Sequence, residues 1–275
     1  MLTMQHPLIY LRNLKDRLFQ RSLLGQLLLS NRLRPDSRRI HLVAATRLSK
    51  AAFWTQSALG QSLKSQTNRP DVAVHIHYAN GQGLPTIYNQ HIRACSASDI
   101  LLFVHDDICF NDNNWPELVR AGIGQFDLVG VAGNVRLQEN QPAWLFKPTQ
   151  TDKPAFVWDH GFLSGAVSHG VDKQSVKQIY GHAPMPCQVL DGVFIAADCA
   201  YLKRARVRFD ERFKFHFYDL DFCRSARQAG LTMATWPINL THSSAGAFGS
   251  PEWRRCWGLY QQKWSPRFQA AQPKR

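Results

Sequence analysis

The sequence contains no pair of cysteines at the CxxC spacing that zinc sites and thiol–disulfide motifs use. Its six cysteines are scattered along 275 residues, and most of them lie within apolar stretches. We therefore expect reduced, buried cysteines, and neither a structural zinc site nor a disulfide framework. The six are Cys95, Cys109, Cys187, Cys199, Cys223 and Cys256.

Long apolar runs are also missing. No run reaches the roughly 18–20 residues that cross a bilayer, and the N-terminus lacks the apolar block and cleavage site of a signal peptide. The sequence has no internal repeat and no low-complexity segment. Because 44% of the residues are hydrophobic and 19% are charged, a sizeable core is expected. We expect a cytoplasmic protein, either soluble or attached peripherally to the inner face of the membrane.

Acidic side chains are few relative to basic ones. There are 20 Asp and Glu residues against 33 Lys and Arg, and residues 1–39 hold eight of the basic and two of the acidic ones. Such a balance suits anionic partners, namely nucleic acid, an anionic membrane surface or a phosphate-bearing substrate. No nucleic-acid-binding motif is present, so nucleic acid is not an expected partner. Leucines at three- and four-residue steps predict a basic helix over residues 8–30, docked on the protein itself, on a second subunit or on a membrane.

Within residues 39–133, stretches typical of strands alternate with stretches typical of helices. This alternation predicts a largely parallel α/β sheet flanked by helices. Binding sites in such folds collect in the loops at the carboxyl ends of the strands. The expected strands are residues 39–46, 71–79, 99–104 and 127–133, and the expected helices are residues 50–65, 84–95 and 114–123.

The second half of the chain has a less regular pattern. Residues 135–185 show weak periodicity and several aromatic side chains, so we expect irregular structure there. Residues 187–197 and 231–242 are predicted strands. Residues 213–217 alternate phenylalanine with lysine and histidine, which predicts a strand, and the helix that follows should end at Gly230.

Two adjacent aspartates, Asp106 and Asp107, follow the buried strand "LLFV". Their charges repel unless a cation lies between them, and carboxylates at a strand end are suitable ligands for Mg²⁺ or Mn²⁺. Such a cation could also bridge to a diphosphate. The alternative is a solvated turn in which one aspartate caps the next helix, and the asparagines nearby favour it.

A second carboxylate pair, Asp219 and Asp221, stands where the predicted strand gives way to a helix. One of the two should cap this helix, or one could act as a general base that reaches a substrate hydroxyl. His242, after the last predicted strand, is either structural or a ligand. The segment "GQGLPT" follows a strand and opens a helix, but it has Thr86 in place of the third glycine and is a weak dinucleotide-binding match.

Five segments resemble, in order, those of GT-A type glycosyltransferases of family 2, nearest to the bacterial glycosyltransferase-like subgroup with StrF-type domains. They are "YNQHIRA", "LLFVHDDI", "VLDGVFIAA", "RFDERFKFHFYDLDFCRSARQAGL" and "THSSAG". The resemblance implies a GT-A type nucleotide-diphospho-sugar transferase fold over residues 40–265, with a mostly parallel central sheet flanked by helices. Residues 1–39 would be an N-terminal helical extension with its linker, and residues 266–275 a basic tail.

The resemblance also implies a role for each matched position. Asp219 would be the catalytic base, Asp107 and His242 the metal ligands, Thr46, Asn80 and Asp106 the donor-nucleotide contacts, and Asp191 and His216 the sugar or acceptor contacts. Apart from the resemblance, Trp144 and Trp158 in the aromatic-rich segment are either buried structural tryptophans or surfaces on which an acceptor sugar ring stacks. Two of the matched positions depart from the family pattern. Tyr218 stands where many members have glutamate, and Asn80 stands where an aspartate is usual.

The implied reaction is a hexosyltransferase-type transfer, with inversion, from a nucleotide-sugar donor to a glycan or other hydroxyl acceptor. It would depend on Mn²⁺ or Mg²⁺ and would belong to bacterial polysaccharide biosynthesis. The nearest alternative enzyme is a sugar-phosphate nucleotidyltransferase, although "VAATRLSK" lacks the glycines of the phosphate loop such enzymes often have after their first strand. A non-catalytic protein that binds a nucleotide or another anion is the second alternative.

Overall fold

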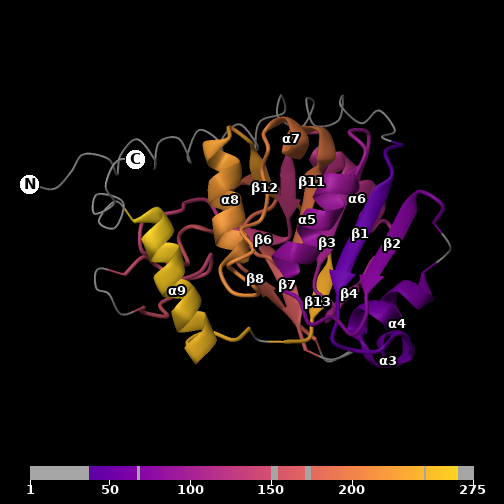
Figure 1. Ribbon diagram of the computed structural model, residues 1–275, viewed down its shortest axis with the longest axis horizontal. Coiled ribbons are helices and arrows are strands. Elements are labelled where there is room, and N and C mark those ends of the chain that lie inside the picture. Colours follow the sequence, from indigo (N-terminus) through magenta and orange to yellow (C-terminus); the bar gives the residue numbers. More distant parts are fainter. Residues whose placement is uncertain (1–36, 67–68, 150–153, 171–174, 245, 266–275) are drawn as a thin grey trace, which may run out of the picture.

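The computed structural model describes residues 37–66, 69–149, 154–170, 175–244 and 246–265. The helix expected over residues 8–30 and the basic tail at 266–275 lie outside these ranges. Two β-sheets form the centre of the described part, and helices lie around them (Figure 1). All six cysteines are free, and five of them are buried as expected.

The larger sheet consists, in the described part of the chain, of β1 (Ile40–Ala45), β2 (Val72–His77), β3 (Ile100–Val104), β5 (Leu128–Gly130), β9 (Met185–Pro186), β11 (Phe194–Asp198) and β12 (Met233–Thr235). Their order across the sheet is β2-β1-β3-β11-β5-β12-β9. β2, β1 and β3 are parallel to one another, and β12 is parallel to β5. β11 and β9 run in the opposite direction. The expected α/β fold with a mostly parallel central sheet is confirmed.

Helices cover this sheet and extend beyond it. They are α3 (Lys50–Gln56), α4 (Ala58–Ser65), α5 (Leu84–Ala94), α6 (Trp115–Ile123), α7 (Cys199–Arg204), α8 (Tyr218–Gln228) and α9 (Pro251–Trp264). In Figure 1, α9 lies at one end of the molecule and the edge strand β2 at the other. The helix predicted over residues 50–65 is two helices, because Ser57 ends α3 and its hydroxyl accepts a hydrogen bond from Gly60 N at the start of α4. Within the described ranges, no helix is long and apolar enough to cross a membrane.

The smaller sheet is built from β4 (Ile108–Phe110), β6 (Ala132–Asn134), β7 (Leu163–His169), β8 (Val176–Ile179), β10 (Val189–Leu190) and β13 (Leu240–His242). Three predicted single strands are each divided between the two sheets, as β5 and β6, β10 and β11, and β12 and β13. β5 and β6 are separated only by Val131, which is fully buried. Because β5, Val131 and β6 are all buried, the sequence has no polar residue there to mark where the chain passes from one sheet to the other.

Three expectations for the second half were wrong. Residues 135–185, expected to be irregular, contain β7 and β8, and the strand expected over residues 213–217 is a turn. Phe217 adopts the left-handed conformation with φ 66°, and α8 begins directly after it with no side-chain cap, so the expected aspartate cap is absent. The helix ends at Gln228, just before Gly230 with φ +82°, as predicted.

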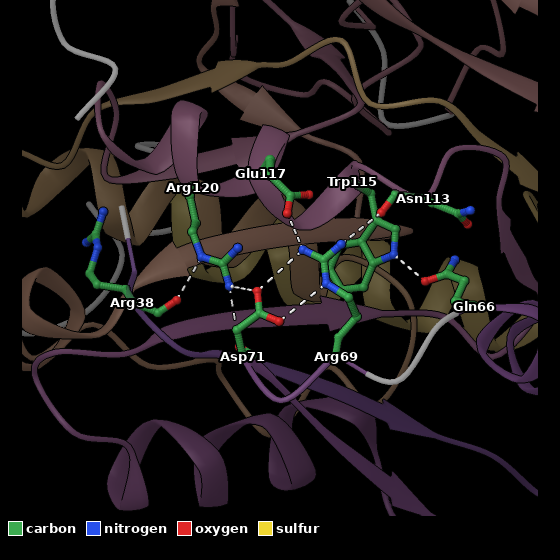
Figure 2. A network of polar contacts seen from close by, with 8 residues as sticks. All are labelled: Arg38, Gln66, Arg69, Asp71, Asn113, Trp115, Glu117 and Arg120. Atoms are coloured by element: carbon green, nitrogen blue, oxygen red, sulfur yellow. Dashed lines mark hydrogen bonds and ion pairs between the residues drawn. The ribbon is translucent and has the colours of Figure 1, made fainter. Parts of the chain in front are cut away.

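A polar network ties α6 to the amino ends of β1 and β2, opposite the strand ends where sites are expected (Figure 2). The Arg120 side chain is only 6% exposed. It donates to the main-chain oxygen of Arg38 over 2.8 Å and to Asp71 Oδ2 over 2.6 Å. Nearer the surface, Arg69 forms ion pairs with Asp71 and Glu117. Arg120 is therefore the buried centre of the network.

Replacing Arg120→Met should lower the free energy of unfolding by about 2 kcal/mol, because it leaves the Arg38 carbonyl and the Asp71 carboxylate without their buried donor. The matched variant Arg69→Met removes a partly exposed arginine from the same network and should cost less than about 1 kcal/mol. Urea denaturation of both variants measures the difference. Equal losses of unfolding free energy in the two variants would mean that the burial of Arg120 does not increase its contribution to stability.

Candidate functional site

Thr46, Asn80 and Asp106 lie together at the carboxyl ends of β1, β2 and β3, respectively. The Asn80 N–H donates to the main-chain oxygen of Thr46 over 2.8 Å and holds two of these strand ends side by side. Burial raises the pKa of Asp106, and the hydrogen bond from the Thr46 hydroxyl opposes this only in part. The three side chains predicted to contact a nucleotide therefore share one edge of the sheet.

These three residues line an open cavity of about 1560 Å³, together with Asp107. Arg47 and Lys214 add positive charge to its wall. A cavity of this size exceeds the 300–1,000 Å³ typical of small-ligand pockets, so it has room for a large anionic ligand. Its volume and its two basic side chains suit a ligand of the size and charge of a nucleoside diphosphate.

The "GQGLPT" segment forms part of this wall, but its glycines do not form a dinucleotide loop. Gly83 precedes α5, and a Cβ atom there would lie 2.9 Å from the Lys214 Cα. The Leu84 N–H donates to the Lys214 carbonyl over 2.9 Å. Glycine is needed at position 83 because two main-chain segments meet there.

A second cavity, of about 220 Å³, opens beside the first. The two have residues in common, and Asp106, Asp107 and Phe215 line both. The other predicted site residues line the smaller cavity, and they are Trp144, Asp191, His216, Asp219 and His242. The structure thus brings all nine predicted site residues to two cavities that meet at the aspartate pair.

The ligand atoms of His105, Asp107 and His242 lie within 4.8 Å of one another. Asp107 Oδ1 is 3.2 Å from His242 Nε2 and 4.0 Å from His105 Nδ1. This oxygen is buried and receives no well-aligned hydrogen bond. Burial would raise the pKa of Asp107, but the two histidines outweigh it and lower the pKa to about 2. One permanently ionised carboxylate between two imidazoles fits a divalent cation.

His105 was not among the predicted ligands, although it directly precedes the aspartate pair in the sequence. It stands two residues before Asp107, where the chain turns between β3 and β4, and imidazole is the commonest metal ligand in proteins. A histidine so close to the pair was the signal that could have identified it. The third member, His242, comes from β13 in the smaller sheet, and no local pattern relates it to the other two.

Asp219 lies in the first turn of α8 and is held by two main-chain donors. Gly192 N donates to its Oδ2 over 3.1 Å, and Leu220 N donates to its Oδ1 over 2.9 Å. Burial, together with the charge of Asp191, raises the pKa of Asp219 to about 7. Such a carboxyl group gains and loses a proton near neutral pH, as a general base must.

Asp221, the second carboxylate of the Asp219 and Asp221 pair, has a structural role. It is fully buried, pairs with Lys263 Nζ over 2.7 Å and accepts a hydrogen bond from Trp264 Nε1 over 2.7 Å. Both partners belong to α9, so Asp221 fastens the C-terminal helix to α8.

Trp144 is 6% exposed and packs edge-on against Tyr180, with ring centres 5.0 Å apart, while it lines the smaller cavity.

Solved structures with similar folds include several glycosyltransferases, all at low similarity. The mannosyltransferase PcManGT from Pyrobaculum calidifontis, in complex with GDP-Man and Mn²⁺, is 12% identical over 92% of this chain and 72% of its own, with a TM-score of 0.44. The catalytic domain of Drosophila β1,4-galactosyltransferase 7 is 12% identical over 79% of both chains, with a TM-score of 0.42. S. aureus TarS 1–349 is 13% identical over 74% of this chain and 60% of its own, with a TM-score of 0.41.

No curated protein matches the sequence. The model of a protein family described as "Glycosyltransferase like family" matches residues 71–271. This match covers well over half of the chain and includes eight of the nine predicted site residues, all except Thr46. The protein therefore belongs to the glycosyltransferase-like family and is a transferase of that kind.

Proposed function

We propose that the protein transfers a sugar from a nucleotide-diphosphate donor to an acceptor hydroxyl, with a divalent cation and with inversion at the anomeric carbon. The observation that supports this most directly is that two cavities meet at Asp106 and Asp107. The larger cavity would hold the donor nucleotide and the smaller one the acceptor. The sugar would then lie at their junction.

Donor binding is assigned to the strand ends and the basic wall. Thr46, Asn80 and Asp106 offer hydroxyl, amide and carboxyl groups to the nucleoside. Arg47 and Lys214 provide positive charge for its diphosphate. In the larger cavity the neutral and acidic groups lie at the strand ends and the basic groups lie in the loops. The nucleoside and the diphosphate would therefore contact different parts of the wall.

Asp107, His242 and His105 would hold the cation, which would neutralise negative charge on the departing diphosphate. Two imidazole ligands favour a transition metal such as Mn²⁺ over Mg²⁺, because Mg²⁺ prefers oxygen.

Asp219 would accept the proton of the acceptor hydroxyl. Its two oxygens are oriented by the N–H groups of Gly192 and Leu220, and each retains a lone pair for that proton. The acceptor oxygen then forms a bond to the anomeric carbon while the bond from that carbon to the diphosphate oxygen breaks. A single displacement of this kind, with the acceptor on the side opposite the diphosphate, inverts the anomeric configuration. Asp191, His216 and Trp144 would contact the sugar or acceptor in the smaller cavity.

Asp107→Asn should weaken Mn²⁺-dependent binding of a nucleoside diphosphate by at least about 100-fold, because the amide removes the negative charge between the two histidines. Calorimetric titration with a panel of nucleoside diphosphates, with and without Mn²⁺, measures this loss. Asp112→Asn is the control. Asp112 lies just after β4 and accepts a hydrogen bond from Asn239, and neither residue lines either of the two cavities. Wild-type protein that binds every nucleotide without Mn²⁺ would contradict the metal role.

Asp219→Asn should lower kcat by about 10³-fold while donor binding is retained, because asparagine has nearly the same shape but cannot take up the proton. Turnover assays and donor titration on the same preparation separate the two effects. Equal losses of kcat and donor affinity would instead place Asp219 in donor binding.

The dependence of kcat/KM on pH should follow the ionisation of Asp219. Its pKa of about 7 lies above the usual aspartate range, so the basic form is fully populated only at higher pH. We expect kcat/KM to fall about tenfold for each pH unit below 7 and to level off above it. A rate that stays constant down to pH 5, measured with saturating Mn²⁺, would exclude Asp219 as the base.

A further inference from the structure

The Tyr218 hydroxyl lies between two polar groups of the site. Its oxygen is 2.9 Å from His105 Nε2 and 2.8 Å from the main-chain oxygen of Gly192. The tyrosine itself is buried, with 3% of its surface exposed. The Tyr218 hydroxyl is therefore largely removed from bulk water, and the donors and acceptors of its contacts must match.

The Tyr88 hydroxyl is a further hydrogen-bond partner of Tyr218, but only one placement of protons satisfies both the His105 and the Gly192 contacts. The Gly192 carbonyl can only accept, so the single proton of the Tyr218 hydroxyl is donated to it. The phenol oxygen must then accept from His105, which places a proton on His105 Nε2. A neutral imidazole carries one N–H, so Nδ1 has a free lone pair. Nδ1 is the nitrogen that faces Asp107 Oδ1, 4.0 Å away.

We propose that Tyr218 fixes His105 in the tautomer with Nε2 protonated and thereby makes His105 Nδ1 the third protein ligand of the cation. This assignment rests on the metal-dependent function proposed above. Tyr218 does not touch the cation, so it is a positioning residue that orients a ligand through its second nitrogen.

The same contacts connect the metal site to the base. The Gly192 carbonyl accepts from Tyr218, and the Gly192 N–H donates to Asp219 Oδ2. A Cβ atom at position 192 would lie 2.3 Å from the Tyr218 hydroxyl oxygen and 3.0 Å from the Asp219 Cβ. One glycine residue, through its N–H and its carbonyl, therefore holds two neighbouring residues of α8, one of which orients a metal ligand while the other takes the proton. This accounts for how the base is oriented although tyrosine replaces glutamate at position 218.

The test combines a proton-location measurement with a metal titration. Long-range ¹H–¹⁵N spectra of metal-free protein with ¹⁵N-labelled histidine, assigned by comparison with His105→Gln, show which nitrogen of His105 carries the proton. In wild type we expect Nε2–H alone. In Tyr218→Phe the acceptor for Nε2–H is lost, so the proton should move to Nδ1, where Asp107 can accept it. Calorimetric titration with Mn²⁺ should then show about 10-fold weaker binding.

Tyr180→Phe is the matched control. The Tyr180 hydroxyl makes the same kind of contact, 2.9 Å from His169 Nε2 in the same cavity, but His169 is outside the metal set. This variant should leave the His105 signals and the Mn²⁺ affinity unchanged.

Wild-type His105 protonated at Nδ1, with normal Mn²⁺ binding, would overturn this inference and leave the proposed function intact. Tyr218→Phe with unchanged tautomer and Mn²⁺ affinity would do the same. Wild type that has the Nε2–H tautomer but binds no Mn²⁺ would overturn the metal half of the proposed function, and the ligand assignment with it. The wild-type spectrum needs no variant, so the tautomer is tested even if Tyr218→Phe fails to fold.

Discussion

Four carboxylates share one largely buried site, and this crowding is the constraint on which the site depends. Burial raises the pKa of Asp106, Asp191 and Asp219, so each of these resists ionisation. Of the four carboxylates, Asp107 has its pKa lowered instead, because His242 and His105 face it. Negative charge is therefore concentrated at the one carboxylate where the two cavities meet and two imidazoles converge. A cation bound at that point, as proposed, would offset this negative charge.

Asp219, the proposed base, shows which electrostatic effect on the pKa prevails. Asp219 sits in the first turn of a helix, where the macrodipole stabilises a negative charge by about 0.3–1 kcal/mol. The pKa of Asp219 is nevertheless raised from 3.8 to about 7, which corresponds to about 4 kcal/mol against the ionised form. Removal of the carboxylate from water and the nearby Asp191 thus outweigh the dipole and both main-chain donors. Without burial, the helix N-terminus would have kept the pKa of Asp219 low, and the carboxylate would be too weak a base at neutral pH.

The first half of the fold could be predicted from the sequence because each element there has one exposed face or a clear end. The expected strands at β1, β2 and β3 and the helices α5 and α6 are present, and the strand ends brought Thr46, Asn80 and Asp106 together as expected. Other features of the fold and the site could not be predicted in the same way. β5 and β6 are joined through a buried valine, so the sequence reads as one strand although the chain changes sheets. His105 was missed because two aspartates beside it were the stronger pattern, and Asp221 differs from Asp219 only through contacts with a helix some 40 residues away in the chain.

The turn at Phe217 sets the orientation of α8 and of the proposed base that it carries, and no periodicity in the sequence marks such a turn. A bulky residue in the left-handed conformation costs about 1–3 kcal/mol, and here that conformation turns the chain so that α8 begins at Tyr218. The Phe217 ring is buried against Trp253, Trp257 and Tyr260 of α9, at ring-centre distances of 4.9, 5.7 and 5.4 Å. Burial of a phenylalanine contributes about 1.5–3 kcal/mol, enough to offset the strain. α9 supplies a single residue, Trp253, to the described cavity walls, yet its packing stabilises the turn that aims Tyr218 and the base toward Gly192.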